Sequence, residues 1–334
     1  MITKLYDFIK TFIKNNYKFI AFWVIVLFLV FYKLPYVILS PGGAINLNNR
    51  IETDTNYDVS GKFELAYVTM RQGNVLNVLL SFIIPEWDIE KQEEYTIKGY
   101  SFDETMEIER LRMKESIDNA TIVAARKANI NLTILREVPT VIIKYDNADT
   151  GIRLMDKIVR VEGQEIKTVT DIQNIIKNYS IGDTLNVQVD RDNKIIDTYA
   201  KLINFENEAK IGIGAVTSYD YETSPKISVS SRSTESGPSG GLMLSLAIYN
   251  AITEKDISKG KTIIGTGTID VEGNVGKIDG VKYKLIGAAK NKADIFFCPI
   301  ENEQEALEVK NKYKLDIEVI AVSTFDDALN ALLD

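Results

Sequence analysis

The sequence GTGTIDVEGNVGKIDGVKYKLIGAA, residues 265–289, decides the fold of the C-terminal part of the chain. Its beginning completes a predicted strand over residues 262–269, and an apolar stripe with Val281, Leu285 and Ala288 predicts a helix over residues 281–289. Strand and helix patterns alternate on both sides. Strands are predicted at 227–230, 295–299 and 317–322, and helices at 239–251, after an Asn302–Glu305 capping box, and at 325–332. Residues 206–334 are therefore predicted to form an α/β module.

A glycine-rich turn, SGPSGG at residues 236–241, precedes the helix that begins near Leu242. A serine at such a place has its hydroxyl beside free backbone N–H groups and the positive end of the helix dipole. Those N–H groups are candidates for an oxyanion hole, and because Pro238 has none, Gly237 and Ser239 would donate. Taken alone, a serine on such a turn is more often a helix N-cap, or the turn an anion-binding site, than a nucleophile.

The chain of 334 residues has no histidine and a single cysteine, Cys298. Ser-His-Asp catalysis, Cys-His catalysis and His-containing metal sites are excluded. Cys298 lies in an apolar run and can form neither an internal disulfide nor a Cys-rich zinc site, so no metal or other cofactor is expected. Any general base for Ser239 is therefore a lysine or a carboxylate.

Residues 265–289, 297–302 and 237–241 together resemble the proteolytic domain of the Lon peptidase family, family S16. That family usually has Gly-Pro-Ser-Ala-Gly where this chain has Gly-Pro-Ser-Gly-Gly, and it uses a Ser–Lys dyad. The resemblance implies that Ser239 is the nucleophile and that Gly237, Pro238 and Gly240 shape its turn.

Two lysines compete for the role of base, and helical phase does not decide between Lys282 and Lys284. The family motif places the base four residues after the glycine that matches Gly280, which is Lys284. Thr266 matches a family threonine whose hydroxyl helps to hold the lysine. As a base, Lys284 needs a pKa lowered from ~10.4 by burial among apolar neighbours.

Residues 135–205 form a separate segment with predicted strands at 138–145, 158–161 and 185–189 and a helix at 170–179. The pattern Gly-x-x-x-x-Asp-x-Ile at residues 151–158 resembles a PDZ domain. The resemblance implies that a substrate binds as an added strand, with Ile142, Ile172 and Ile176 as candidate contacts. The alternative is a small mixed α/β domain without a groove.

Upstream of this segment, Ser101 and Glu104 form a predicted capping box for a helix over residues 102–128. Within it, residues 113–116 resemble the Met-x-Glu-Ser helix that precedes the nucleophile in Lon domains. Residues 44–134 would then be the first part of the Lon-like domain, with the PDZ-like segment inserted between Ile130 and Ile211.

At the N-terminus, an apolar stretch over residues 17–39 is long enough to cross a bilayer as a helix. Lys4, Lys10, Lys14 and Lys18 precede its unbroken apolar run of residues 19–32, which predicts a cytoplasmic N-terminus and an extracellular catalytic domain. Residues 33–37 offer no clean signal-peptidase site, so residues 1–43 are predicted to be an uncleaved, single-pass anchor to the cell membrane rather than a signal peptide.

The formal net charge of −8 argues against nucleic acid as a partner. Residues 260–262 match the end of a Walker A loop, but Lys255 stands where its first glycine is required, so no nucleotide is expected. The order of segments resembles the YlbL-type, PDZ-containing Lon-like proteases of Gram-positive bacteria. The sequence thus predicts an α/β (α+β) Lon fold and an ATP-independent serine endopeptidase that cleaves proteins or peptides. A homo-oligomer is compatible with this prediction. A catalytically silent scaffold and an anion-binding module are the alternatives.

Overall fold

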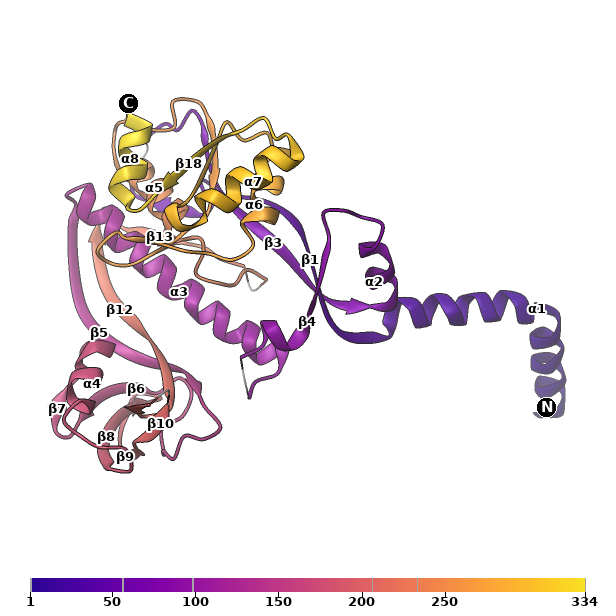
Figure 1. Cartoon of the computed structure of the whole chain (residues 1–334), viewed down its shortest axis with the longest axis horizontal. Helices are drawn as coiled ribbons and strands as arrows, with labels where there is room; N and C mark the ends of the chain where they lie inside the picture. Colours follow the sequence, from indigo (N-terminus) through magenta and orange to yellow (C-terminus); the bar gives the residue numbers. More distant parts are fainter. Residues whose placement is uncertain (1, 56, 98, 206, 233, 334) are drawn as a thin grey trace. The chain divides into compact units, whose positions relative to one another are not determined.

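The computed structural model describes residues 2–55, 57–97, 99–205, 207–232 and 234–333 (Figure 1). The chain divides into two compact units, one of residues 1–41 and 68–96 and one of residues 42–67 and 97–334. The strands β1 (Lys33–Asn46) and β3 (Lys62–Asn74) run through both units.

The first unit contains the N-terminal helix α1 (Ile2–Phe31). Its segment Phe8–Phe31 is long and apolar enough to span a membrane, and none of it is buried within the structure. The unit also contains α2 (Val75–Ser81), a 3-10 turn (Gln92–Tyr95) and β4 (Asp88–Lys91), which pairs antiparallel with β1.

The predicted helix over residues 17–39 is wrong at its C-terminal end, because the helix ends at Phe31 and β1 begins at Lys33. Pro35 explains the boundary: it has no N–H to donate to Phe31, and in a helix its ring would clash with the carbonyl of that residue. Residues 40–43 also belong to β1.

The second unit contains a mainly parallel sheet in which β18 (Glu318–Val322), β17 (Ile295–Pro299), β14 (Thr262–Gly265), β3 and β1 follow one another. Neighbouring strands from β18 to β3 are parallel. The helices of this part are α3 (Phe102–Lys127), α5 (Gly241–Ile252), α6 (Val281–Lys290), α7 (Glu303–Tyr313) and α8 (Phe325–Leu333). Almost every residue of α5 is buried, since α5 packs against both β14 and α3. Helix and strand therefore alternate as the sequence predicts.

Two details of this domain differ from the sequence prediction. The strand predicted over residues 262–269 is two strands, β14 and β15 (Thr268–Ile269), because β15 leaves the sheet to pair with β16 (Val275–Gly276). Asn302 does not cap α7 with its side chain. It lies at the end of a 3-10 turn (Ile300–Asn302) and uses its amide to bond the backbone N–H and C=O of Ile278.

Helix α3 begins as predicted, with a reciprocal capping box between Ser101 and Glu104. Met113, Ala120 and Ala124 of its apolar stripe are buried in the core that α3 shares with α5. The remaining short strands are β2 (Ile51–Thr53), which pairs with β13 (Ile227–Val229), and β10 (Ile203–Phe205), which pairs with β11 (Glu208–Lys210).

A long antiparallel ribbon of β5 (Asn131–Lys144) and β12 (Ile213–Ser224) leads into and out of a second sheet (Figure 1). This sheet has the order β12-β5-β6-β8-β9, with β6 (Lys157–Val161), β8 (Thr184–Arg191) and β9 (Lys194–Lys201), while β7 (Gln164–Glu165) also pairs with β6. Helix α4 (Val169–Ile176) contributes Ile172, Ile175 and Ile176 to a hydrophobic core of its own.

Candidate active site

The turn before α5 places Ser239 at the N-terminal end of a buried helix, with its residue partly exposed. Gly237 has a φ of +90°, a left-handed conformation that glycine adopts without steric cost. Gly241 has no room for a side chain, because a Cβ there would lie 2.6 Å from Cγ2 of Ile269 and 2.9 Å from Oγ of Ser116. The glycines therefore allow the serine to sit on a tight turn packed against its neighbours.

Hydrogen bonds fix the backbone on both sides of the nucleophile. The carbonyl of Pro238 accepts from Ser116 Oγ at 2.9 Å, and the carbonyl of Ser239 accepts from Thr266 Oγ1 at 3.0 Å and from Gly267 N at 2.8 Å. Because both carbonyls are held, the peptide planes of the turn have a defined orientation.

The oxyanion donors differ from the sequence hypothesis in one respect. The N–H of Gly237 already donates to the carbonyl of Glu109 at 2.8 Å. The N–H groups of Ser239 and Gly240, in contrast, have no acceptor among the residues that the structure describes. The available pair is therefore Ser239 and Gly240.

Lys284 lies in the first turn of α6, which begins after Gly280 in a left-handed conformation. Its Nζ is 3.0 Å from Ser239 Oγ and 3.1 Å from Thr266 Oγ1, and the residue is only 5% exposed. Burial lowers the pKa of Lys284 to about 8, against an opposing effect of the charge on Asp279. Lys282, the rival base, is partly exposed with its amine 5.2 Å from the centre of the Tyr283 ring.

This geometry suits proton transfer. With a pKa about 8, about a tenth of Lys284 is neutral at pH 7, compared with well under a thousandth for an unperturbed lysine. A neutral amine within hydrogen-bond distance of a serine hydroxyl is positioned to accept its proton.

Potential metal ligands and the single thiol can be placed in the part of the chain that the structure covers. No group of three or more potential ligands among His, Cys, Asp and Glu is found there. Cys298 is buried, and burial raises the pKa of its thiol to about 12, which keeps it protonated and unreactive.

The three candidate peptide contacts do not form an open groove. Ile172 and Ile176 lie buried in the core around α4, whereas Ile142 belongs to a separate buried cluster with Ile108 and Val216. All three side chains are at most 8% exposed.

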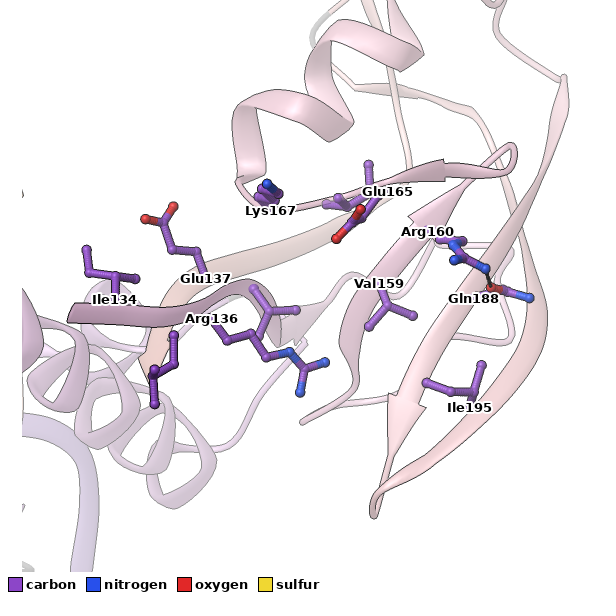
Figure 2. A pocket seen from close by; sticks show the side chains of 12 residues that line it. Ile134, Arg136, Glu137, Val159, Arg160, Glu165, Lys167, Gln188 and Ile195 are labelled. Atoms are coloured by element: carbon purple, nitrogen blue, oxygen red, sulfur yellow. Dashed lines mark hydrogen bonds between the residues drawn. The ribbon is translucent and has the colours of Figure 1, made fainter. Parts of the chain in front are cut away.

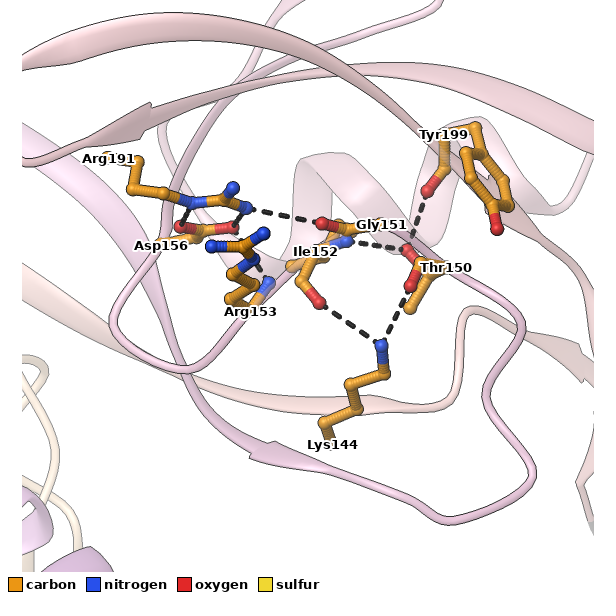
Figure 3. Close-up of polar contacts among 8 residues, drawn as sticks. All are labelled: Lys144, Thr150, Gly151, Ile152, Arg153, Asp156, Arg191 and Tyr199. Carbon is orange, nitrogen blue, oxygen red and sulfur yellow. Dashed lines mark hydrogen bonds and ion pairs between the residues drawn. The ribbon is translucent and has the colours of Figure 1, made fainter.

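The PDZ-like motif of residues 151–158 is a structural element (Figure 3). Asp156 receives two hydrogen bonds from Arg191, at 2.7 Å from Nε and 2.6 Å from a terminal nitrogen, and one from the backbone of Arg153. Lys144 Nζ donates to the carbonyls of Thr150 and Ile152. These bonds hold the loop, so the aspartate of the motif stabilises the conformation of the loop.

Sequence reasoning did not assign a role to Ser116, although the resemblance of residues 113–116 pointed to its helix. Ser116 is 3% exposed and lies three residues after Met113, on the side of α3 that faces the turn. A serine on the apolar side of a helix was the available signal.

Two segments of the chain match known protein families. Residues 226–334 match the model of the Lon protease (S16) C-terminal proteolytic domain, and residues 136–202 match that of the PDZ domain. Similar relatives include the Lon proteases of Campylobacter jejuni, 35% identical over 98 residues, and Mesomycoplasma hyopneumoniae, 37% identical over 89 residues. The match spans 29% and 27% of this chain but only 12% and 10% of those relatives.

Among solved structures, the PDZ domain of an SdrC-like protein from Listeria monocytogenes is similar, with 22% identity, coverage of 23% of this chain and 86% of that one, and a TM-score of 0.22. The two family matches define the class of each domain: residues 226–334 are similar to a Lon-type proteolytic domain and residues 136–202 to a PDZ domain, in a chain with an apolar N-terminal helix. 

Proposed function

We propose that this chain is a membrane-anchored serine endopeptidase in which Ser239 is the nucleophile and Lys284 the general base. The observation that carries the proposal is the 3.0 Å contact between Lys284 Nζ and Ser239 Oγ in a site where the lysine is buried. The match to a Lon-type proteolytic domain supports a peptidase.

In the proposed reaction, neutral Lys284 takes the proton of Ser239 as its Oγ attacks the scissile carbonyl. The N–H groups of Ser239 and Gly240 donate to the oxyanion. Lys284, now an ammonium, gives the proton to the leaving amine and is neutral again. Thr266 holds both partners, since it donates to the carbonyl of Ser239 and accepts from Lys284.

We further propose that hydrolysis needs no ATP, because the dyad consumes none and the loop around Lys261 lacks the glycine pattern that binds phosphates. The PDZ domain would bind protein or peptide substrates. Residues 135–205 would be an insertion between residues 44–134 and 206–334 of the Lon-like domain, which the pairing of β5 with β12 supports.

A serine-reactive fluorophosphonate probe tests the activity on the full-length chain. We expect labelling of the wild type and of Lys282→Ala without ATP, and none of Ser239→Ala. The rival scaffold gives no labelling of any of the three, whereas labelling of Ser239→Ala would place the nucleophile elsewhere.

The apolar segment Phe8–Phe31 supports the anchor, and the four lysines before the unbroken apolar run of residues 19–32 support a cytoplasmic N-terminus. Protease added to intact cells stripped of their wall should digest residues 44–334. Their protection from protease in intact cells, with digestion after lysis, would contradict this topology.

A further inference from the structure

The strand edge beside α4 is already used by the chain itself. A peptide that joins a PDZ sheet needs an unpaired strand edge. From Thr140 to Lys144, β5 pairs with β12 through residues 213–216, and α4 packs against β12. Ile213 also packs against the core of this domain. A substrate strand therefore cannot join β5 beside α4 while β12 is in place.

The opposite edge of β5 is open over residues 131–138. β6 pairs with β5 only at Thr140↔Lys157. Farther along β6, the strand that pairs with it is β7 instead of β5. No described strand other than β12 pairs with residues 131–138. Both backbone groups of Val141 bond toward residues 155 and 156, and alternation along the strand turns those of Glu137 to the same side. The backbone of Glu137 thus faces the opening.

A pocket of about 550 Å³ fills this opening, with β5 as one wall and β6 and β7 as the other (Figure 2). Its volume lies in the ~300–1,000 Å³ range of ligand sites. Leu135 and Ile195 line it and are 60% and 61% exposed, so a ligand that covers them would bury apolar surface. Figure 2 shows Arg136 and Glu137 pointing to opposite sides of β5. The register of β5 with β12 shifts next to them, where Leu135 is an extra residue between the pairs of Ile134 and Arg136.

The charges around the pocket balance. Its lining carries three cations and two carboxylates, and Asp190 pairs with Arg136 at 3.4 Å. A highly charged peptide or a terminal carboxylate therefore gains no net attraction. The backbone edge and the exposed apolar side chains remain as the means of recognition.

We infer that the PDZ domain binds an extended internal segment of a substrate protein, with apolar side chains at alternate positions, as a strand added to the outer edge of β5 at Ile134–Val138. The inference rests on the proposed function, because the bound segment belongs to a protein that this chain is proposed to cleave. Binding itself requires no catalysis.

The first test uses full-length Ser239→Ala protein in detergent, which removes cleavage from the measurement. A ten-residue peptide with alternating apolar residues and an internal photo-crosslinker is offered with a free and with an amidated C-terminus. We expect equal affinity for both forms and adducts at residues 134–138 and 159–167. A tenfold loss on amidation, adducts confined to residues 169–176 or 213–216, or no binding would overturn the inference.

Matched variants in the same background sharpen the test. Leu135→Ser should weaken binding about tenfold, and Glu137→Pro, which removes an N–H facing the opening, should weaken it by at least as much. Leu154 is 46% exposed but does not line the pocket, so Leu154→Ser should bind as the parent does. Equal binding by Leu135→Ser and Leu154→Ser, with melting curves showing that both are folded, contradicts the site. Binding to the edge with no cleavage by the wild type would refute the proposed function alone. Cleavage by the wild type with no binding to the edge would refute this inference alone.

Discussion

Two buried charged groups, Asp156 in the PDZ domain and Lys284 in the proteolytic domain, are treated in opposite ways. Asp156 is 1% exposed and both of its oxygens accept hydrogen bonds from Arg191. Lys284 is 5% exposed, and its amine contacts two hydroxyls, those of Ser239 and Thr266. No carboxylate of the described residues lies within ion-pair distance of it.

The difference teaches how burial produces either structure or reactivity. Pairing offsets the cost of removing the Asp156 charge from water, so the pair holds the loop of residues 151–156. Without an ionic partner, the ammonium form of Lys284 is disfavoured and its pKa falls to about 8, within reach of physiological pH. A buried charge without a counterion is thus the feature that marks the candidate base.

The largest expected effect follows from removing either member of the dyad. Ser239→Ala and Lys284→Ala should each lower kcat/KM for a peptide at least ~1,000-fold, and the double variant should lose little more, because the two groups act as a unit. Lys282→Ala, two residues away on the same helix, should retain most activity. An inactive Lys282→Ala beside an active Lys284→Ala would show that the base is Lys282 and not Lys284.

Breaking the paired charge should affect stability instead of chemistry. Arg191→Ala leaves the Asp156 carboxylate buried without its partner, which should destabilise the PDZ domain by about 3 kcal/mol. Urea unfolding followed by far-UV circular dichroism measures the loss of stability. Cleavage of a short peptide under native conditions should remain, and a loss of that activity equal to the loss in Lys284→Ala would contradict the contrast between the two sites.

Removing the unpaired charge should do the opposite and stabilise the protein. The folded pKa of Lys284, about 8, lies below its value of 10.5 in an unfolded chain, so the folded state pays the cost of protonation fully below pH 8 and not at all above pH 10.5. Lys284→Met should therefore raise the free energy of unfolding at pH 7 by about 3 kcal/mol, with the difference vanishing toward pH 10.5. A variant less stable than the wild type at pH 7 would show that the ammonium is compensated.

A smaller effect is expected at Thr266, which orients both groups without reacting. Thr266→Val keeps the shape but removes the hydroxyl that bonds Lys284 and the carbonyl of Ser239. The loss of one or two hydrogen bonds of about 1 kcal/mol each should lower kcat about tenfold. Thr266→Ser should restore it, and a Val variant with full activity would remove Thr266 from the proposed site.

The sequence was informative wherever neighbouring residues decide the structure. The Ser101–Glu104 capping box and the helix that it begins are confirmed because they depend on residues only three or four positions apart. Asn302 shows the limit of this reasoning. Its spacing to Glu305 fits a capping box, but its amide is engaged by the backbone of Ile278, 24 residues away.

Long-range pairing was the other limit. The stretch of residues 33–39 is apolar enough to extend a membrane helix, but Pro35 and pairing with β4 place it in a strand. The closing of the β5 edge by β12 depends on residues about 70 positions apart, so no local pattern predicted it. The proximity of Ser239, Thr266 and Lys284 came from a family resemblance rather than from spacing, and their catalytic roles stay predictions.

The pH dependence of kcat/KM on a peptide substrate, measured from pH 6 to pH 9.5, tests the central claim most directly. Only neutral Lys284 accepts the proton of Ser239, so the rate should rise about tenfold per pH unit below the folded pKa of about 8 and level off above it. Thr266→Val provides a comparison in which the height of the curve falls and the shape remains sigmoidal. A midpoint near pH 8 is the expected result, and a rate that is flat between pH 6 and pH 9 would contradict a titrating lysine as the base.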